Sequence, residues 1–248
     1  MVFLRNMTRL RLSTTARSVA LVISVALIAA GCSASSRQPV NLPPTGPELK
    51  IMALGDSLTF GARVPGGYRT QLAKRLEAKG NRFVFVGSQS DDQAPNNARI
   101  HEGHTGYWIK NINEYDEEWL KAQPDIIVLT AGTNDILKNV GADAPAAMGA
   151  LLKSISDTAP RAEIVVSTIP PLRDFQPQVD AYNQALPGVV DAAAAQGIKV
   201  RLVNAGPSFS AKDLDEEGVH PLSIKGYNAF GDAVAVPINE IYSKIKSS

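Results

Sequence analysis

Five apolar runs of strand length, each followed by a longer segment with a helical pattern, constrain the fold of this chain more than any other feature. The runs are rich in Ile, Val, Leu and Phe and lack polar alternation, which is typical of strands covered on both faces. They lie at Leu49–Leu54, Arg82–Gly87, Asp125–Ala131, Glu163–Ile169 and Ile198–Asn204. The helical segments lie at Gly67–Lys79, Ile109–Ala122, Ala144–Thr158, Phe175–Gln196 and Ser223–Lys246.

Strict alternation of strand and helix predicts an α/β fold, a three-layer α/β/α sandwich with a five-stranded parallel sheet. The reason is that right-handed crossovers between parallel strands place helices on both faces of the sheet. A chain of 248 residues with 44% hydrophobic content is sufficient for one such core. We assign residues 49–248 to this single domain.

The first 48 residues have a different composition. Basic residues up to Arg17 precede the apolar stretch Val19–Ala30, which is the layout of a secretory signal peptide over residues 1–31 and is too short to span a bilayer. The only cysteine, Cys32, ends this region as in a bacterial lipobox that lacks its usual leucine. We predict lipidation at Cys32 and a flexible linker over residues 32–48, so the protein is secreted or lipid-anchored to the cell envelope. The alternative is a plain secretory signal cut nearby.

The charge of the chain argues against nucleic acid as a partner. The sequence has 25 basic and 24 acidic residues, and residues 1–31 hold four arginines and no acidic residue. Without that leader, 21 basic residues face 24 acidic ones, a net charge of −3. No cluster of lysine and arginine marks a surface for phosphate backbones.

Polar segments that contain glycine follow the first three predicted strands. They read Gly55-Asp56-Ser57, His101–Gly106 and Gly132–Asp135. Ligands of parallel α/β sheets bind beyond the carboxyl ends of the strands, so we expect these segments to converge on one rim.

A serine and a histidine at that rim suggest nucleophilic catalysis. Ser57 follows the first strand directly, and His220 lies on a loop before the last helix, with Glu217 three residues earlier. A serine hydroxyl becomes a nucleophile when a histidine oriented by a carboxylate takes its proton. Taken singly, Ser57 is equally compatible with a helix cap and His220 with a solvated loop residue.

Gly55-Asp56-Ser57-Leu58, the glycine loop ending at Gly106, Gly132–Asp135 and the terminal histidine together resemble the blocks of the SGNH (GDSL) hydrolase family, from about Leu49 to the C-terminus. The resemblance implies the flavodoxin-like SGNH hydrolase fold and no cofactor or metal. It implies that Ser57 is the nucleophile and His220 the base. The oxyanion hole would consist of the backbone N–H groups of Ser57 and Gly106 and the side chain of Asn134, with Gly103 the rival of Gly106.

The third member of the triad departs from the family pattern. The family has aspartate three residues before the histidine, where this chain has Glu217. We expect Glu217 to orient His220, with Asp215 or a backbone carbonyl as the alternatives. Asp56 and Asp135 are expected to hold turns through hydrogen bonds to backbone amides.

Three further motifs resemble carbohydrate esterase family three, whose members remove acetyl groups from polysaccharides such as xylan. They are Gly66-Gly67-Tyr68-Arg69, Phe85-Val86-Gly87-Ser88 and His101-Glu102-Gly103-His104. The two histidines of the last motif are a thin ligand set for a metal. We expect His104, Tyr107 and Trp108 to line the substrate cleft, although Trp108 is equally compatible with a place in the core.

The expected function is that of a serine esterase that hydrolyses short acyl esters and deacetylates a polysaccharide. The polar loops at the rim argue against a trench for long acyl chains. The alternatives are a general short-acyl esterase or lysophospholipase of the same fold and, from another class, a carbohydrate-binding protein without catalysis. The expected partners are a small ester or an acetylated carbohydrate; the sequence does not predict the oligomeric state.

Overall fold

The computed structural model describes residues 46–247. The predicted signal peptide over residues 1–31, the lipidation site Cys32 and nearly all of the linker lie outside this range and remain predictions. The elements, in chain order, are β1 (Glu48–Gly55), α1 (Ser57–Phe60), α2 (Gly67–Ala78), β2 (Arg82–Val86), β3 (Gln89–Ser90), η1 (Asn96–Ala98), β4 (Ile100–Gly103), α3 (Ile109–Trp119), η2 (Leu120–Ala122), β5 (Ile126–Thr130), α4 (Thr133–Leu137), α5 (Ala144–Thr158), β6 (Glu163–Ser167), α6 (Gln176–Ala195), β7 (Val200–Val203), η3 (Gly206–Ser208), η4 (Ala211–Asp213) and α7 (Ile224–Lys246).

The sheet contains the five predicted parallel strands in the order β2-β1-β5-β6-β7. It also contains two short strands that the sequence did not suggest. β4 runs parallel to the end of β1, pairing Leu54 with Glu102 and Gly55 with Gly103, and β3 runs antiparallel to β4. The fold class is therefore confirmed, and the expected count of five strands becomes seven.

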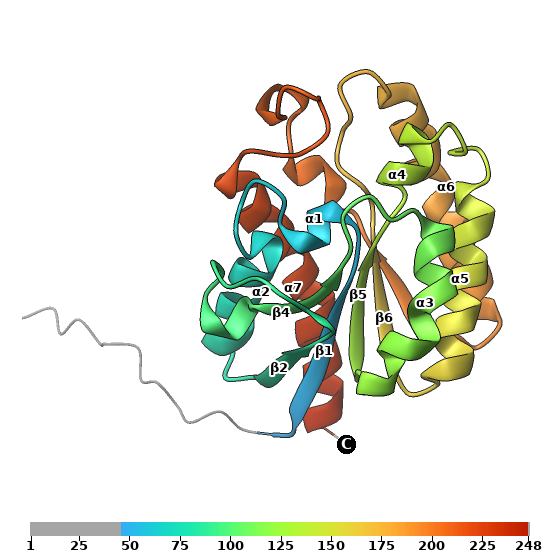
Figure 1. Cartoon of the computed structure of the whole chain (residues 1–248). Helices are drawn as coiled ribbons and strands as arrows, with labels where there is room; N and C mark the ends of the chain where they lie inside the picture. The colour runs from blue at the N-terminus through green and yellow to red at the C-terminus, as the bar shows by residue number, and fades with distance from the viewer. Residues whose placement is uncertain (1–45, 248) are drawn as a thin grey trace, which may run out of the picture. The chain divides into compact units, whose positions relative to one another are not determined.

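Side chains alternate between the two faces of β1, and each face carries its own hydrophobic core. Met52 and Leu54 belong to the core under α3, α5 and α6. Ile51 and Ala53 belong to the core under α2 and α7 on the opposite face. Figure 1 shows these two groups of helices on either side of the sheet. The result is the three-layer arrangement that the alternating sequence predicts.

The long helices lie where their patterns predict them, within a residue or two at each end. The only larger adjustment is at α3, where the last predicted turn is the 3-10 helix η2. Among residues 46–247, we find no helix with the length and apolarity needed to cross a bilayer. The helices pack on the two faces of the sheet, and the polar segments predicted to form the site lie in the loops at its carboxyl edge.

Candidate active site

Ser57 is the first residue of the short helix α1 and lies directly beyond the end of β1. Two local features build this turn. A Cβ on Gly55 would lie 2.1 Å from the carbonyl oxygen of Thr130, so only glycine lets the ends of β1 and β5 approach so closely. Asp56 then caps α1 by accepting a hydrogen bond from the backbone N–H of Leu58 at 3.0 Å. The nucleophile candidate is therefore held on a rigid strand-to-helix turn.

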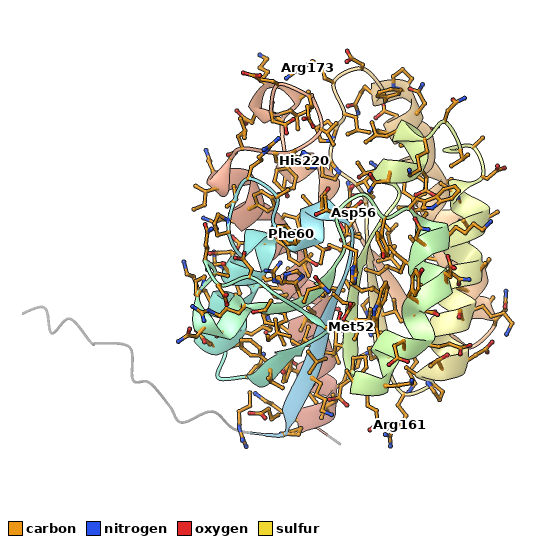
Figure 2. The ribbon with its side chains drawn as sticks, viewed as in Figure 1. Met52, Asp56, Phe60, Arg161, Arg173 and His220 are labelled. Carbon is orange, nitrogen blue, oxygen red and sulfur yellow. The ribbon has the colours of Figure 1, made fainter. Side chains whose placement is uncertain are left out.

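His220 reaches the same turn from the far end of the chain. Its Nε2 lies 3.1 Å from the Oγ of Ser57, across 163 residues of sequence. Figure 2 shows His220 and Asp56 near each other in the upper half of the molecule and Arg161 at its lower end. The structure thus brings together the hydroxyl and the imidazole that the sequence singled out, within hydrogen-bond distance.

Asp215, and not Glu217, is the carboxylate bound to His220. Oδ2 of Asp215 lies 3.0 Å from Nδ1 of the imidazole, whereas Glu217 is exposed. The expectation for Glu217 is therefore corrected in favour of its alternative. The reason is the shape of the loop: Leu214 and Pro221 form an antiparallel bridge and the N–H of Asp215 donates to the carbonyl of His220, so these two residues face each other. Glu217 lies in the intervening turn.

Several donors surround the carboxylate of Asp215. Its Oδ1 accepts hydrogen bonds from the backbone N–H groups of Val219 and His220. Its Oδ2 accepts two more from the guanidinium of Arg63, both at 3.1 Å. Burial alone would raise the pKa of Asp215, but these four donors and the imidazole together hold the pKa well below its ordinary value. Asp215 is therefore an anion at neutral pH.

A second arginine holds the loop of His220 by its backbone. Arg173, in the segment after β6, donates to the carbonyl oxygens of Glu216 at 2.9 Å and Asp215 at 2.8 Å. A Cβ on Gly218 would lie 2.7 Å from the Cβ of Arg173, so glycine permits this close packing. Neither Arg63 nor Arg173 is predictable from the sequence, because both contacts join segments far apart in the chain.

The loop between β4 and α3 carries Gly106 and is held by three hydrogen bonds. The N–H of His104 donates to the carbonyl of Gly55 at 2.9 Å. The side-chain amide of Asn134 donates to the carbonyl of Tyr107 at 2.8 Å, and Asp135 accepts the N–H of Ile109 at 3.1 Å. An amide nitrogen has two hydrogens, so Asn134 can hold the loop and still offer a donor elsewhere.

Of the two glycines considered as oxyanion donors, the geometry favours Gly106. The N–H of Gly103 donates to Nδ1 of His101 at 3.0 Å, and a Cβ there would lie 2.4 Å from the backbone nitrogen of Phe60. Gly103 thus allows β4 to pack against α1. Gly106 is exposed, has a φ of 81°, and has no atom within 4 Å of the place a Cβ would take. Its role as a donor remains a prediction.

His104 supports the loop through contacts of its ring, and its expected place in the substrate cleft remains a prediction. Its Nε2 lies 2.5 Å from Oε1 of the buried Glu102, and its ring stacks on that of Trp119 at a centroid distance of 4.3 Å. Tyr107 lies 4.9 Å away and is half-buried, as is Trp108. A motif based on neighbours in sequence could not identify Trp119, which comes from the far end of α3.

Asp56 and Asp135 play the structural role expected of them, each accepting a backbone N–H. Burial raises the pKa of Asp56 to about 7, opposed by the hydrogen bond from Leu58 and assisted by the negative charge of Asp135. Burial also raises the pKa of Asp135, opposed by the N–H of Ile109. Asp56 therefore carries a proton in acidic solution.

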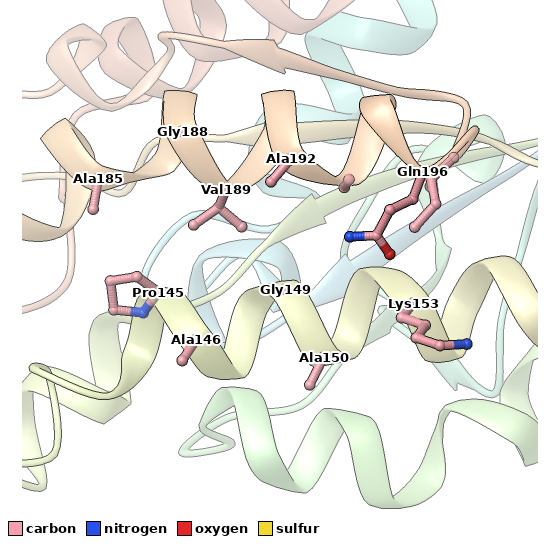
Figure 3. A pocket seen from close by; sticks show the side chains of 12 residues that line it. Pro145, Ala146, Gly149, Ala150, Lys153, Ala185, Gly188, Val189, Ala192 and Gln196 are labelled. Carbon is pink, nitrogen blue, oxygen red and sulfur yellow. The ribbon is translucent and has the colours of Figure 1, made fainter.

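A small hollow lies beside the hydroxyl and the imidazole. Its lining combines the reacting groups with apolar side chains: Asp56, Ser57, Leu58, Thr133, Pro170, Leu172, Val219, His220 and Pro221. A larger groove lies between α5 and α6 (Figure 3), but its lining contains no carboxylate, imidazole or hydroxyl group. The chemistry therefore belongs to the small hollow.

One group of side chains in the described part has the composition of a cation site. Asp215, Glu217 and His220 have ligand atoms within 4.8 Å of one another. However, the carboxylate of Asp215 already accepts hydrogen bonds from Arg63 and from the imidazole. The donor set thus fits the orientation of an imidazole better than the ligation of a metal.

The sequence of residues 53–228 matches the GDSL-like Lipase/Acylhydrolase family. The chain belongs to this family. It is thereby classed among the carboxylic ester hydrolases, in agreement with the serine and histidine found at the rim.

Three proteins similar to this chain are esterases. A family 3 carbohydrate esterase of Clostridium thermocellum is 30% identical, with a TM-score of 0.69 over 80% of this chain and 100% of that chain. An acetyl esterase variant with an acetate ion has a TM-score of 0.70 at 23% identity, over 79% of this chain and 99% of that chain. A multidomain esterase of Ruminococcus flavefaciens is 28% identical over 80% of this chain, which spans only 30% of that relative's length.

Proposed function

We propose that the protein is a serine esterase that removes acetyl groups from a polysaccharide. One observation carries the proposal: Ser57, His220 and Asp215 form a continuous line of hydrogen bonds at the carboxyl edge of the sheet. Asp215 fixes the proton of the imidazole on Nδ1, which leaves the lone pair of Nε2 to accept the proton of the Ser57 hydroxyl.

The reaction follows from that geometry. The Oγ of Ser57 attacks the ester carbonyl carbon while Nε2 of His220 takes the hydroxyl proton and then passes it to the departing alcohol oxygen. Water, activated by the same nitrogen, attacks the acetyl-serine and releases acetate. The backbone N–H groups of Ser57 and Gly106 and the side chain of Asn134 would stabilise the negative oxygen of each tetrahedral intermediate.

A short acyl group suits the hollow beside Ser57. Leu58 and Leu172 line it and are themselves buried, so they form walls rather than the sides of an open trench. A methyl group gains from such apolar contacts, whereas a long chain would have to displace buried side chains. The acetyl esterase among the structural relatives agrees with this choice.

An aromatic cluster next to the Gly106 loop supports a carbohydrate on the alcohol side of the ester. Tyr107, Tyr115 and Trp119 have ring centroids about 6 Å apart, and Tyr115 is 45% exposed. Aromatic rings that offer an apolar face beside a polar edge suit the apolar faces of sugar rings. The similarity to a family 3 carbohydrate esterase also supports a carbohydrate substrate.

The proposed setting is extracytoplasmic, because residues 1–31 have the composition of a secretory signal. We propose that Cys32 then carries the lipid that tethers the enzyme to the envelope. The absence of membrane association in a Cys32→Ala variant, with association in the parent protein, is the expected result. Equal membrane association in both would remove this part of the proposal.

Acetate release from acetylated xylan and from acetylated peptidoglycan tests the proposed function, alongside 4-nitrophenyl acetate and octanoate. We expect acetate from a polysaccharide, preference for the acetyl over the octanoyl ester, and no activity in Ser57→Ala. Hydrolysis of small esters alone would favour the alternative of a general short-acyl esterase. Full turnover by Ser57→Ala would overturn the mechanism.

A further inference from the structure

Arg63 contacts the same carboxylate oxygen as the imidazole of His220. Its Nε and one terminal nitrogen each lie 3.1 Å from Oδ2 of Asp215, and Nδ1 of His220 lies 3.0 Å from that oxygen. We propose that Arg63 is a positioning residue, which fixes the Asp215 carboxylate and limits how readily His220 is protonated. This inference rests on the proposed serine esterase mechanism and assigns it a further residue.

The backbone around Arg63 is tied to the nucleophile. The N–H groups of Gly61 and Ala62 donate to the carbonyl of Ser57 at 3.1 and 3.0 Å. The hydroxyl of Tyr227, from α7, donates to the carbonyl of Ala62 at 3.2 Å. Arg63 therefore extends directly from the turn that carries Ser57 and joins this turn to the carboxylate.

Arg63 adopts a backbone conformation that glycine would adopt more easily. Its φ is 69°, in the left-handed region that disfavours residues with a side chain. The same turn has glycine at two other positions with positive φ, Gly61 and Gly66. Glycine at position 63 would relieve the backbone, so it is the informative substitution.

Charge gives Arg63 a second effect. Its guanidinium and the imidazole of His220 both contact one oxygen, so they lie within about 6 Å of each other, a distance at which like charges disfavour one another. The other charged groups facing the pair are the carboxylate of Glu217, within 4.8 Å, and Arg173, which contacts backbone carbonyls of the loop. Asp56 adjoins the nucleophile. Arg63 is the cation that contacts the carboxylate itself.

The experiment compares Arg63→Gly, Arg63→Lys and the parent protein on 4-nitrophenyl acetate across pH 5–9. For Arg63→Gly we expect kcat to fall about ten- to a hundredfold because the carboxylate is less precisely placed. The acid limb of kcat/KM should move up by about half a pH unit or more. Arg63→Lys keeps the charge and should move the limb less. The matched control is Arg75→Ala, which breaks a similar two-bond pair with Asp232 between α2 and α7 and should leave both readouts unchanged.

A second readout does not depend on turnover. In a Ser57→Ala background, NMR follows proton uptake by the His220 ring, and its midpoint should move to higher pH with Arg63→Gly. The thermal midpoint should change by less than about 4 °C, since relief of the left-handed residue offsets the lost ion pair. An unchanged pH profile and unchanged ring titration in Arg63→Gly would overturn the inference, even if activity fell. A parent protein inactive on every ester would refute the proposed function, while the ring titration would still decide the effect of Arg63.

Discussion

The replacement of Asp215 by asparagine is the most informative single change, because the structure fixes how the new side chain must lie. Oδ1 of Asp215 accepts two backbone N–H groups, from Val219 and His220, which cannot turn away, whereas the half-exposed guanidinium of Arg63 at Oδ2 can, so we expect the amide oxygen to take the position of Oδ1. The NH2 group then takes the place of Oδ2, facing Arg63 and Nδ1 of the imidazole. The NH2 group can form a hydrogen bond with the imidazole only if Nδ1 carries a lone pair and no hydrogen.

The consequence is the wrong tautomer of His220. With a lone pair on Nδ1, the ring proton moves to Nε2, which can no longer accept the proton of Ser57. We expect kcat to fall about 10⁴-fold, equivalent to about 5 kcal/mol of transition-state stabilisation. The assay is the hydrolysis of 4-nitrophenyl acetate at saturating substrate, with circular dichroism to verify that the variant is folded.

Glu217→Gln is the matched control, since it changes the neighbouring carboxylate in the same chemical way. Glu217 is exposed, and an exposed charge contributes less than about 1 kcal/mol, so the loss should stay below about fivefold. Equal losses in the two variants, or a greater loss in Glu217→Gln, would refute the assignment of Asp215 as the partner of His220.

The remaining predictions concern the oxyanion hole, a buried acid and the carbohydrate surface. Asn134→Ala should lower kcat about 100- to 1,000-fold with little change in KM, as measured by steady-state kinetics on the acetyl ester. Asp56→Asn keeps a side-chain oxygen that accepts the N–H of Leu58, but its amide cannot ionise. Because the pKa of Asp56 is raised to about 7, the unfolded parent loses its proton first as pH rises from about 4, which destabilises the folded state by up to about 4 kcal/mol by pH 7. Urea unfolding at pH 4.5 and 7.5 should show the variant gaining stability relative to the parent over this interval. Tyr115→Ala should reduce acetate release from acetylated xylan several-fold and leave 4-nitrophenyl acetate hydrolysis unchanged; parallel losses on both substrates would contradict a role in holding sugar.

The sequence predicted β1, β5 and β6 because burial on both faces leaves a plain apolar run. The edge strands β2 and β7 are only partly buried but still have apolar runs of strand length. The sequence did not predict β4, whose buried residues include His101 and Glu102. The N–H and hydroxyl of Ser88 donate to the carboxylate of Glu102, and Nδ1 of His101 accepts the N–H of Gly103, while Nε2 of the same ring is buried with no hydrogen-bond partner among the described residues. These contacts form only when the chain is folded. In the sequence alone, the polar residues of β4 therefore have the composition of a loop.

The site was predictable where motifs follow strands and less so where it depends on contacts across the chain. Ser57 and His220 carried enough local context to be paired. A spacing of three residues before His220 predicts Glu217 as the orienting carboxylate, whereas the loop pairs Asp215 with His220 directly across a turn that contains Gly218. Arg63 lies 152 residues from Asp215, and no local pattern indicates that contact.

The most direct test of the central claim is rapid acid quenching of the enzyme during turnover of an acetyl ester, followed by mass spectrometry of its peptides. The account predicts one acetyl group on the peptide that contains Ser57, formed in the parent protein and greatly reduced in His220→Ala. An acetyl group on another residue, or the same yield at Ser57 without the imidazole, would contradict it.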